Sequence, residues 1–392
     1  MYEAIDTLRT PSDGVIDGGL RRGMVAVAEP TYPNAEHATV NGVFLQALQR
    51  VCGPVVFAST AVQHGAVMEA DPRAPRIAWD QIPVLPPGGV HLRRIRAQWD
   101  AMNALVLRHR SPALVLLSAG PETLFVARAL VARHPRLRVY VVMHGNLAEV
   151  AGWRSRDPRR RMIDLRSGLA VARHKRIRLV VLDDYIKRAA ERLVPGQDFL
   201  VWPIPVVAAE RAPMLEWHAP DRLGLTFVGT ANRGKGFDDY LALYREAGPS
   251  YRWSVAGRLG NEFGPGDVGD IPFFTGYSSR DVFLSEVRRA DYAVLAFRPA
   301  YALTTSASLL DCVTQRKPVI AVANDMLRRL AGDHGPIGYL CPTLEAMQEL
   351  IATPERLRDE AAYAQFQRGL DSIYHSRGFG QLTVTIQRDL VS

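Results

Sequence analysis

The sequence predicts an α/β protein with two doubly wound, Rossmann-like domains that face each other across a cleft. Short apolar runs alternate with helical patterns along almost the whole chain of 392 residues, which is typical of βαβ units and parallel sheets. Prolines are concentrated between Trp202 and Pro220, as in a linker, and the alternation then starts again. The expected domains are residues 1–207 and 208–374, and a C-terminal helix at 375–392 can pack back on the first domain.

The first domain is expected to contain short strands separated by helices. Apolar runs predict strands at 24–28, 55–58, 76–79, 113–118, 138–144, 178–182 and 199–202. Helical patterns predict helices at 37–51, 91–108 and 122–134, and a basic helix at 159–175.

The second domain repeats this scheme. Its predicted strands are 223–229, 252–256, 273–276, 294–297, 318–323 and 338–341, and its predicted helices are 236–246, 280–289, 308–315 and a long one from 344 towards 374. In doubly wound sheets ligands bind at the carboxyl ends of the strands. A cleft between two such sheets therefore suits an enzyme with two substrates.

The composition is that of a folded, enzyme-sized protein, with 47% hydrophobic and 22% charged residues. Its 3 cysteines are too few and too scattered for a disulfide framework or a zinc site. No apolar run approaches the roughly 18 residues that span a bilayer, and the first residues do not resemble a secretory signal, so we expect a cytoplasmic protein. Without an Asp-x-Asp motif or a Gly-x-Ser-x-Gly elbow, we expect no metal, no other cofactor and no serine hydrolase chemistry.

Positive charge is concentrated in the first half of the chain. Residues 1–205 hold 28 Lys and Arg against 18 Asp and Glu, while the remainder holds 20 against 22. The densest stretch runs from Trp153 to Arg178. It is either a solvated Arg-rich helix or a surface for an anionic membrane face or a phosphate-bearing substrate. Nucleic acid is not an expected partner, because aromatic residues that stack on bases are not interleaved with the basic ones.

A Gly-rich turn between a strand and a helix is the clearest local signal for a binding site. Gly229 follows the strand, and Arg233 and Lys235 add positive charge before the helix starts. Free backbone amides and the helix dipole at such a turn favour a phosphate group. The spacing matches neither a P-loop nor a dinucleotide fingerprint, and a purely structural turn is the alternative.

A second anion site is predicted at the start of the helix near residue 308. Thr305, Ser306 and Ser308 bring hydroxyls together there, and Asp311 could accept hydrogen bonds from a sugar diol. The alternative is that the serines cap the helix and Asp311 complements its dipole.

The first domain offers a third group of candidates. His144 ends a buried strand, and Glu29, His37 and Asn41 flank the loop after the first strand, where they would face the same cleft. The alternatives are a loop histidine with ordinary partners and residues that cap the next helix.

These pieces, taken in order, resemble the GT-B glycosyltransferases and, within them, the retaining family 4 group. The resemblance covers most of the chain and rests on short motifs. They are His144-Gly145, residues 179–187, the interdomain segment 201–206, the loop 227–236 and residues 274–277, 290–292 and 311–321.

The resemblance implies transfer of a sugar from a nucleotide-diphosphate sugar to an acceptor hydroxyl, without a metal and with retention. It implies that Lys235 and Arg233 hold the pyrophosphate beside Gly229, and that Thr305, Ser306 and Ser308 hold its distal phosphate. Asp311 would stand where the family has a Glu for the ribose, and Gly276 and Tyr277 would lie near the base. His144 would contact the transferred sugar, and Glu29, His37 and Asn41 would face the acceptor.

The sequence also departs from the family. Leu303 stands where the first Glu of a Glu pair is usual, and Thr230 replaces a common Arg. The expected acceptor is a glycan or a lipid-linked glycan in polysaccharide or glycolipid assembly, met by a peripheral membrane protein on the inner face. A nucleotide-sugar epimerase of GT-B shape, a degenerate nucleotide-sugar-binding protein and, from another class, a nucleic-acid-binding protein remain the alternatives.

Overall fold

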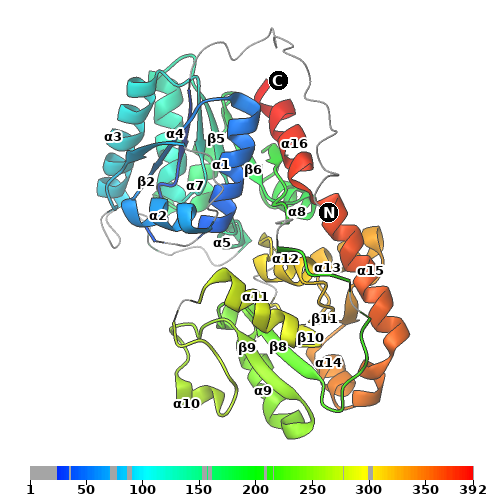
Figure 1. Ribbon diagram of the computed structural model, residues 1–392. Helices are drawn as coiled ribbons and strands as arrows, with labels where there is room; N and C mark the ends of the chain where they lie inside the picture. Colours follow the sequence, from blue (N-terminus) through cyan, green and yellow to red (C-terminus); the bar gives the residue numbers. More distant parts are fainter. Residues whose placement is uncertain are drawn as a thin grey trace, which may run out of the picture.

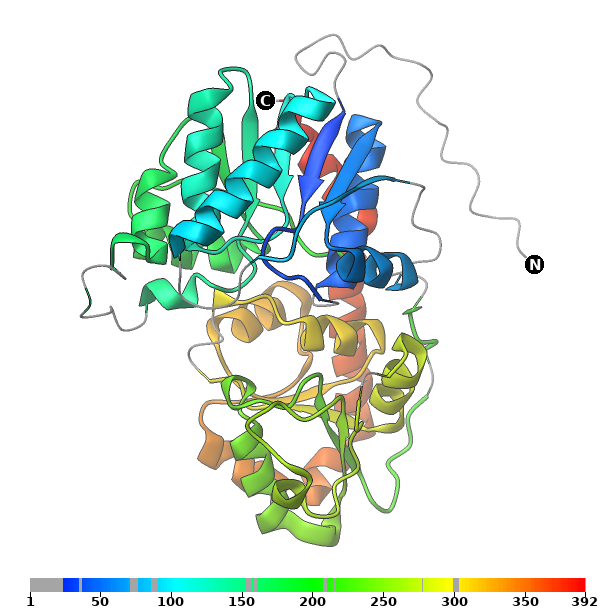
Figure 2. The same cartoon turned by 90° about the vertical axis from the view of Figure 1, so that its left-hand side faces the viewer.

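The chain folds into two α/β domains that lie one above the other (Figures 1 and 2). The computed structural model describes residues 24–34, 37–70, 77–85, 91–151, 157, 161–206, 210–214, 216–276, 278–298 and 303–391. Within these residues there are two wholly parallel sheets, of seven and five strands. The α/β prediction, with two doubly wound domains, is therefore confirmed.

The sheet of the first domain has the strand order β3-β2-β1-β4-β5-β6-β7. The order reverses between β1 and β4, and a reversal of this kind is where doubly wound sheets bind ligands. Its described strands are β1 (Val25–Ala28), β2 (Val55–Ser59), β3 (Ala78–Gln81), β4 (Ala113–Leu116), β5 (Arg138–Val142), β6 (Ile177–Val181) and β7 (Phe199–Val201).

Helices cover both faces of this sheet because side chains alternate along each strand. In β1, Val25 and Val27 pack towards α1, α2 and the C-terminal helix α16 (Phe379–Val391), while Ala26 and Ala28 pack towards α3, α4, α7 and α8. The helices that the first domain contributes are α1 (Ala38–Cys52), α2 (Ala61–Ala70), α3 (His91–His109), α4 (Pro121–Arg133), α5 (Ala148–Ala151), α7 (Leu165–Val171) and α8 (Asp184–Leu193).

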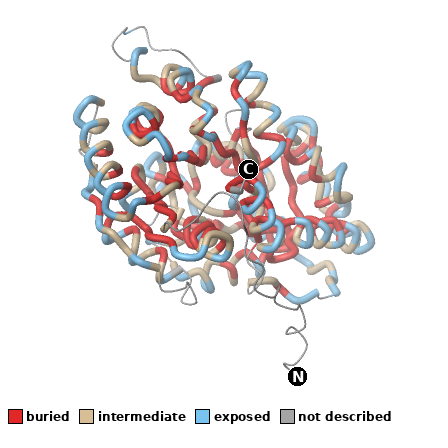
Figure 3. Tube along the Cα trace, turned by 90° about the horizontal axis from the view of Figure 1, so that it is seen from above, coloured by how far each residue is buried: buried red, intermediate tan, exposed pale blue. Residues whose placement is uncertain are grey.

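The sheet of the second domain has the order β12-β11-β10-β8-β9, with its reversal between β8 and β10. Its described strands are β8 (Gly224–Val228), β9 (Arg252–Ala256), β10 (Tyr292–Leu295), β11 (Val319–Val322) and β12 (Gly338–Cys341). Its helices are α9 (Phe237–Ala247), α10 (Pro265–Val268), α11 (Arg280–Arg289), α12 (Ala307–Thr314), α13 (Asp325–His334), α14 (Leu344–Ile351) and α15 (Glu360–Ser376). Buried segments form the interior of both domains, and the outer faces of the helices are exposed (Figure 3).

Two predicted elements were wrong, and a third is shorter than predicted. The segment 273–276 is not a strand, because Phe274 makes only an isolated bridge with Arg258. The long helix from 344 is two helices, α14 and α15, separated by the 3-10 turn Pro354–Arg358. Pro354 disfavours a helical conformation at the residue before it. The predicted basic helix 159–175 contains α7 in its described part, and α7 begins at Leu165 after the cap residue Asp164.

The chain crosses between the domains twice. After α15 it returns to the first domain as α16 (Phe379–Val391), whose Leu382 and Ile386 pack in the same core as Phe44 of α1. Trp202 Nε1 donates to Asp389 Oδ2 at 3.0 Å and holds α16 in place. The two crossings lie side by side, since the Val206 amide donates to the Arg377 carbonyl at 3.0 Å.

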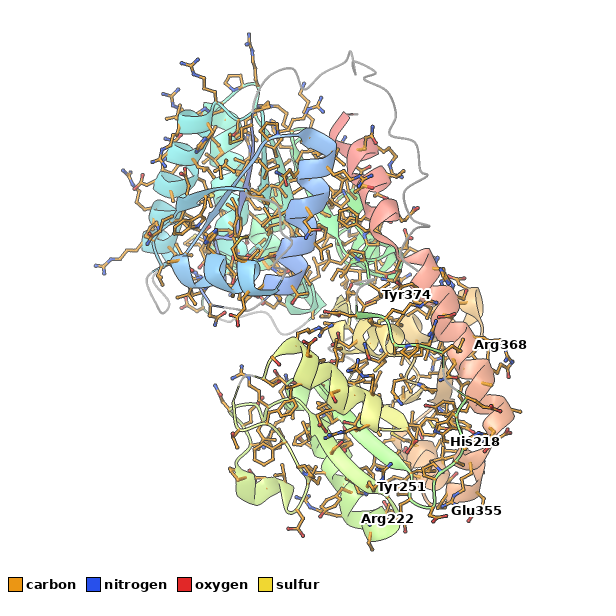
Figure 4. All side chains as sticks on the ribbon, in the orientation of Figure 1. His218, Arg222, Tyr251, Glu355, Arg368 and Tyr374 are labelled. Carbon is orange, nitrogen blue, oxygen red and sulfur yellow. The ribbon has the colours of Figure 1, made fainter. Side chains whose placement is uncertain are left out.

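The linker from the first to the second domain runs along α15 (Figure 4). The Arg211 guanidinium lies 4.0 Å from the centre of the Tyr374 ring, and its Nη2 is 2.6 Å from Asp371 Oδ1. Further along, His218 Nδ1 lies 3.5 Å from Glu360 Oε1. Among the described helices, none is both long and apolar enough to cross a membrane.

Candidate active site

The loops that follow the strands of the two sheets meet at the junction between the domains. Gly145, after β5, packs against Thr304, which precedes α12: a Cβ on Gly145 would lie 2.7 Å from Thr304 Oγ1. Tyr185 Oη, after β6, donates to the Thr304 carbonyl at 2.7 Å. The candidate residues of both domains follow strands at this junction, where doubly wound sheets place their ligands.

The turn after β8 brings a lysine and a serine together at a glycine. Lys235 Nζ donates to Ser308 Oγ at 3.0 Å, and Ser308 Oγ donates to the Val228 carbonyl at 2.7 Å. Gly229 has φ +90°, and a Cβ on it would lie 2.8 Å from Lys235 Nζ. Only glycine therefore lets the ammonium group lie against this turn.

Three backbone amides of this turn donate hydrogen bonds within the protein. The amides of Gly229 and Ala231 donate to the carbonyls of Ala256 and Arg258 at 2.8 Å and 2.9 Å. The Lys235 amide donates to Asn232 Oδ1 at 3.0 Å. The expectation that free amides here would bind an anion is wrong for these three amides, whereas the Lys235 side chain brings a full positive charge against the turn.

Lys235 is partly buried and short of negative charge. Loss of hydration lowers the pKa of Lys235 to about 8, although the nearby Asp311 carboxylate opposes this shift. A bound anion would stabilise the charged ammonium group and so compensate for the hydration that it loses on burial. Arg233 does not join this group: 64% of its side chain is exposed, and its Nε lies 4.0 Å from Asp238 Oδ1.

The three hydroxyls before and in α12 have different tasks. Ser306 caps the helix, with Oγ accepting from the Leu309 amide at 3.1 Å, as the capping alternative predicted. The Ser308 hydroxyl accepts a hydrogen bond from Lys235, which orients that side chain, and donates its own hydrogen bond to the Val228 carbonyl. Thr305 Oγ1 is buried and has no hydrogen-bond partner among the described residues, so it is the hydroxyl left for a ligand.

Asp311, one turn further along α12, is held by an arginine that sequence reasoning missed. Arg280 Nη2 donates to Asp311 Oδ1 at 2.6 Å, and the same guanidinium contacts Glu210 at 2.9 Å and 2.7 Å. Burial raises the pKa of Asp311, and the Arg280 charge opposes that shift. A signal was present in the sequence: Arg280 opens a helix, where the dipole disfavours a cation unless carboxylates pair with it.

Two histidines stack at the first-domain side of the junction. The His37 and His144 rings are 4.2 Å apart and 9° from parallel. Burial lowers the pKa of His37 to about 4, and burial together with His37 lowers that of His144 to about 3, so both are neutral at pH 7. Within the described part of the chain, His37 Nδ1 and His144 Nε2 are buried without a hydrogen-bond partner.

His37 does not serve as the helix cap that was the alternative. It stands at the N-cap of α1 with φ 63°, and its side chain makes no capping hydrogen bond. A left-handed conformation costs a non-glycine residue about 1 to 2 kcal/mol. A strained histidine that does not cap its helix favours a role in binding.

Glu29 and Asn41 organise the loop beside the histidines. Glu29 is 1% exposed and accepts hydrogen bonds from the amides of Thr31 and Tyr32, from Asn41 Nδ2 and from Ser118 Oγ. Burial raises the pKa of Glu29, which those donors counteract. Glu29 thus positions the loop, whereas Asn41 Oδ1 has no partner among the residues described.

The residues predicted to lie near the base are only partly described. Gly276 is exposed at the end of its described segment, and Tyr277 lies outside the described residues. Their predicted role in base binding stays a prediction.

Comparisons with known proteins place this constellation in a known fold. No family model and no curated protein matches the chain. A sucrose-phosphate synthase from Thermosynechococcus elongatus is similar over 94% of this chain and 98% of its own, with TM-score 0.70 and 14% identity. HepE from Anabaena, solved with UDP and glucose, is similar over 95% and 100%, with TM-score 0.68 and 11% identity. A glycosyltransferase from Rickettsia africae is similar over 95% and 99%, with TM-score 0.68 and 10% identity.

The chain has the GT-B fold. The GT-B prediction is thereby confirmed, while family 4 membership stays a prediction. In this GT-B fold the Lys235 turn belongs to the second domain and the histidine pair to the first.

A cavity of about 600 Å³ lies elsewhere in the GT-B fold, between α8, β7, α13 and α16, and contains none of the candidate residues. Among the residues that the structure describes, no three His, Cys, Asp or Glu side chains are grouped to hold a metal ion.

Proposed function

We propose that this GT-B protein is a glycosyltransferase that moves a sugar from a nucleotide-diphosphate sugar to an acceptor hydroxyl. The observation that carries the proposal is the Lys235 ammonium, held by Ser308 against Gly229 at the strand reversal of the second sheet. A desolvated ammonium at that position suits a pyrophosphate, because binding an anion there replaces lost hydration.

The first domain supports the sugar half of the proposal. Buried polar atoms without partners are rare in folded proteins. Here His37 Nδ1, His144 Nε2 and Asn41 Oδ1 lack a partner among the described residues of the first domain, and Thr305 Oγ1 lacks one on the opposing loop. Hydroxyls of a bound sugar and acceptor would supply the missing hydrogen bonds.

In the proposed reaction the bond between the sugar and the diphosphate breaks, and charge develops on the leaving phosphate. Lys235 and the start of α12 stabilise that charge, which would explain catalysis without a metal. Asp311 would hold the ribose, and His144 would contact the transferred sugar. We further propose retention without a protein nucleophile, because the Glu29 carboxylate is already committed to the loop, and the leaving phosphate can take the acceptor proton.

The donor is tested by calorimetry with the diphosphates of uridine, guanosine, adenosine and thymidine and their sugars, with and without magnesium. UDP-sugars come first, because HepE was solved with UDP and glucose. Loss of one transition-state donor typically costs a factor of about 100 or more in turnover, which is the loss expected for Lys235→Ala.

The control is Lys187→Ala, which removes a lysine that pairs with Glu191 and Asp198 away from this turn. If Lys235→Ala binds and turns over the donor as well as the control, the proposed phosphate site is wrong. Product analysis separates the alternatives: an epimerase would convert the nucleotide sugar without an acceptor, and a degenerate binding protein would leave it unchanged.

We also propose a glycan or lipid-linked acceptor and reversible docking on an anionic membrane face through residues 153–178, which vesicle flotation tests. Of this stretch, residues 153–156 and 158–160 lie outside the described residues. Arg173 Nη2 donates to the Pro195 carbonyl at 2.9 Å, and Arg176 Nη1 donates to the His134 carbonyl at 2.7 Å. These two guanidinium groups serve the fold, so docking would depend on other basic residues such as the exposed Lys175.

A further inference from the structure

We propose that Arg280, itself held by Glu210 of the interdomain linker, positions the Asp311 carboxylate to read the ribose hydroxyls of the donor. The inference rests on the proposed function and names a positioning residue for the same site. Three charged side chains are joined in one line: Glu210 of the linker, Arg280 of α11 and Asp311 of α12. Of these, Asp311 is the one beside Lys235 of the donor turn.

The contacts in this line are short and directional. The Arg280 guanidinium meets both oxygens of Glu210, from Nε at 2.9 Å and from Nη2 at 2.7 Å, and Nη2 also reaches Asp311 Oδ1 at 2.6 Å. The exposed side-chain fractions are 17% for Glu210, 35% for Arg280 and 12% for Asp311. A planar guanidinium that bridges two carboxylates in this way fixes their orientation as well as their charge.

The position of Asp311 connects this line to the phosphate site. Ser308, which orients Lys235, precedes Asp311 by three residues on α12, so the two side chains lie on the same face of the helix. Arg280 contacts Oδ1, and among the described residues no hydrogen bond reaches Oδ2. Oδ2 is thus the oxygen that remains to accept from a ligand hydroxyl.

Arg280 also keeps that oxygen a good acceptor. Burial favours the neutral form of Asp311, and the facing guanidinium favours the carboxylate. An ionised carboxylate is an acceptor only, which matches two neighbouring hydroxyl donors. Without Arg280, Asp311 would lose both its fixed rotamer and its charge partner.

The linker holds the far end of the line in place. Gln315 Nε2, at the end of α12, donates to the Glu210 carbonyl at 2.6 Å, so Glu210 is fixed by its backbone as well as by Arg280. Arg280 opens α11 after the cap residue Ser279, at the end where the dipole disfavours a cation. The two carboxylates offset that cost, so Arg280 stands at this helix end because of its partners and not because of the helix itself.

The test measures binding of UDP, 2′-deoxy-UDP and inorganic pyrophosphate by calorimetry. The wild-type protein should prefer UDP over 2′-deoxy-UDP, because only UDP offers both ribose hydroxyls. In Arg280→Gln, UDP should bind about tenfold more weakly, since a charge-assisted hydrogen bond is lost. The ratio of the affinities for UDP and 2′-deoxy-UDP should then approach one. Pyrophosphate should bind as before. Arg280→Lys, which keeps the charge but not the fork, should lie between the two.

The matched control is Arg289→Gln in the same helix. Arg289 Nη1 donates to Glu286 Oε1 at 2.6 Å within α11, so this variant also removes a guanidinium–carboxylate contact but leaves the contacts of Glu210 and Asp311 in place. Its preference for UDP should equal that of the wild type. Thermal unfolding of each variant separates loss of folding from loss of recognition.

Three outcomes would overturn the inference. Arg280→Gln could keep the full preference for UDP, or it could lose pyrophosphate and UDP equally, or Arg289→Gln could lose the preference as well. A wild-type protein that binds neither UDP nor pyrophosphate would overturn the proposed function, and the inference with it. If the wild-type protein binds UDP and the Arg280→Gln variant keeps the preference for UDP, only the inference is overturned and the proposed function stands.

Discussion

The stacked pair of His37 and His144 places two neutral, largely dehydrated imidazole rings at the first-domain side of the junction. An unfolded chain protonates them near pH 6.5, whereas the folded chain resists until about pH 4 and about pH 3. The unfolded state therefore binds more protons below pH 6.5. Stability is present above that pH and falls as the pH drops, by up to about 1.4 kcal/mol per pH unit for each histidine.

We expect His37→Gln to lose less stability than the wild type when the pH is lowered from 7.5 to 5, as measured by urea unfolding at both values. The comparison uses the change between the two pH values, so the cost of the substitution itself cancels. His218→Gln is the control, because 71% of that side chain is exposed. An equal acid sensitivity in all three proteins would refute the account of the pair.

Among single residues, the sequence singled out candidates that the structure places after strands. Lys235, Ser308 and His144 each stand near the carboxyl end of a parallel strand, where position along the chain implies position in space. Arg280 and Glu210 meet across 70 residues. The place of Arg280 at a helix start signals that it has acidic partners, but no local pattern identifies Glu210 as one of them. The sequence also did not show that the Gly229 and Ala231 amides donate to the carbonyls of Ala256 and Arg258.

Among elements, the turn between β8 and α9 depends most on a single residue. In Gly229→Ala the new methyl group would meet Lys235 Nζ at 2.8 Å and Ser308 Oγ at 2.9 Å, besides straining a backbone at φ +90°. We expect a stability loss of at least about 1 kcal/mol, together with loss of pyrophosphate binding. Chemical denaturation and calorimetry measure the two effects.

Gly196→Ala is the matched variant for this turn. Gly196 has φ +79°, but a Cβ there would meet nothing within 4 Å. It should therefore cost similar stability and leave pyrophosphate binding intact. If both variants bind pyrophosphate equally, the turn is only structural.

The strands were easier to predict than the helices. Continuous apolar runs such as those of β4 and β5 report burial on both faces directly. The helix α2 was missed, because its apolar residues are spread around the helix and its Gly65 weakens the pattern. The break between α14 and α15 was also missed, because the helical pattern of apolar residues continues through it. The backbone restriction at Pro354 outweighs that pattern.

For the whole molecule, the contact of Tyr185 Oη with the Thr304 carbonyl at 2.7 Å is one of the bonds that hold the domains together. Removing it in Tyr185→Phe should cost about 1 kcal/mol, which shifts a closed-to-open equilibrium by a factor of about five. Small-angle X-ray scattering of the free protein should then give a larger radius of gyration.

Tyr339→Phe is the corresponding control, because the Tyr339 hydroxyl donates to the Arg356 carbonyl within the second domain. It should leave the radius of gyration unchanged. A Tyr185→Phe protein with the dimensions of the wild type would show that this bond does not hold the domains in their relative position.

The double crossing of the chain between the domains has a consequence for proteolysis. A single cut in the linker leaves the second domain attached through α15 and α16, and α16 remains buried against α1 and Trp202. A cut just after Arg377 leaves the domains attached through the linker, with α16 held by noncovalent packing. The nicked protein should therefore run as one particle in gel filtration and as two bands after denaturation.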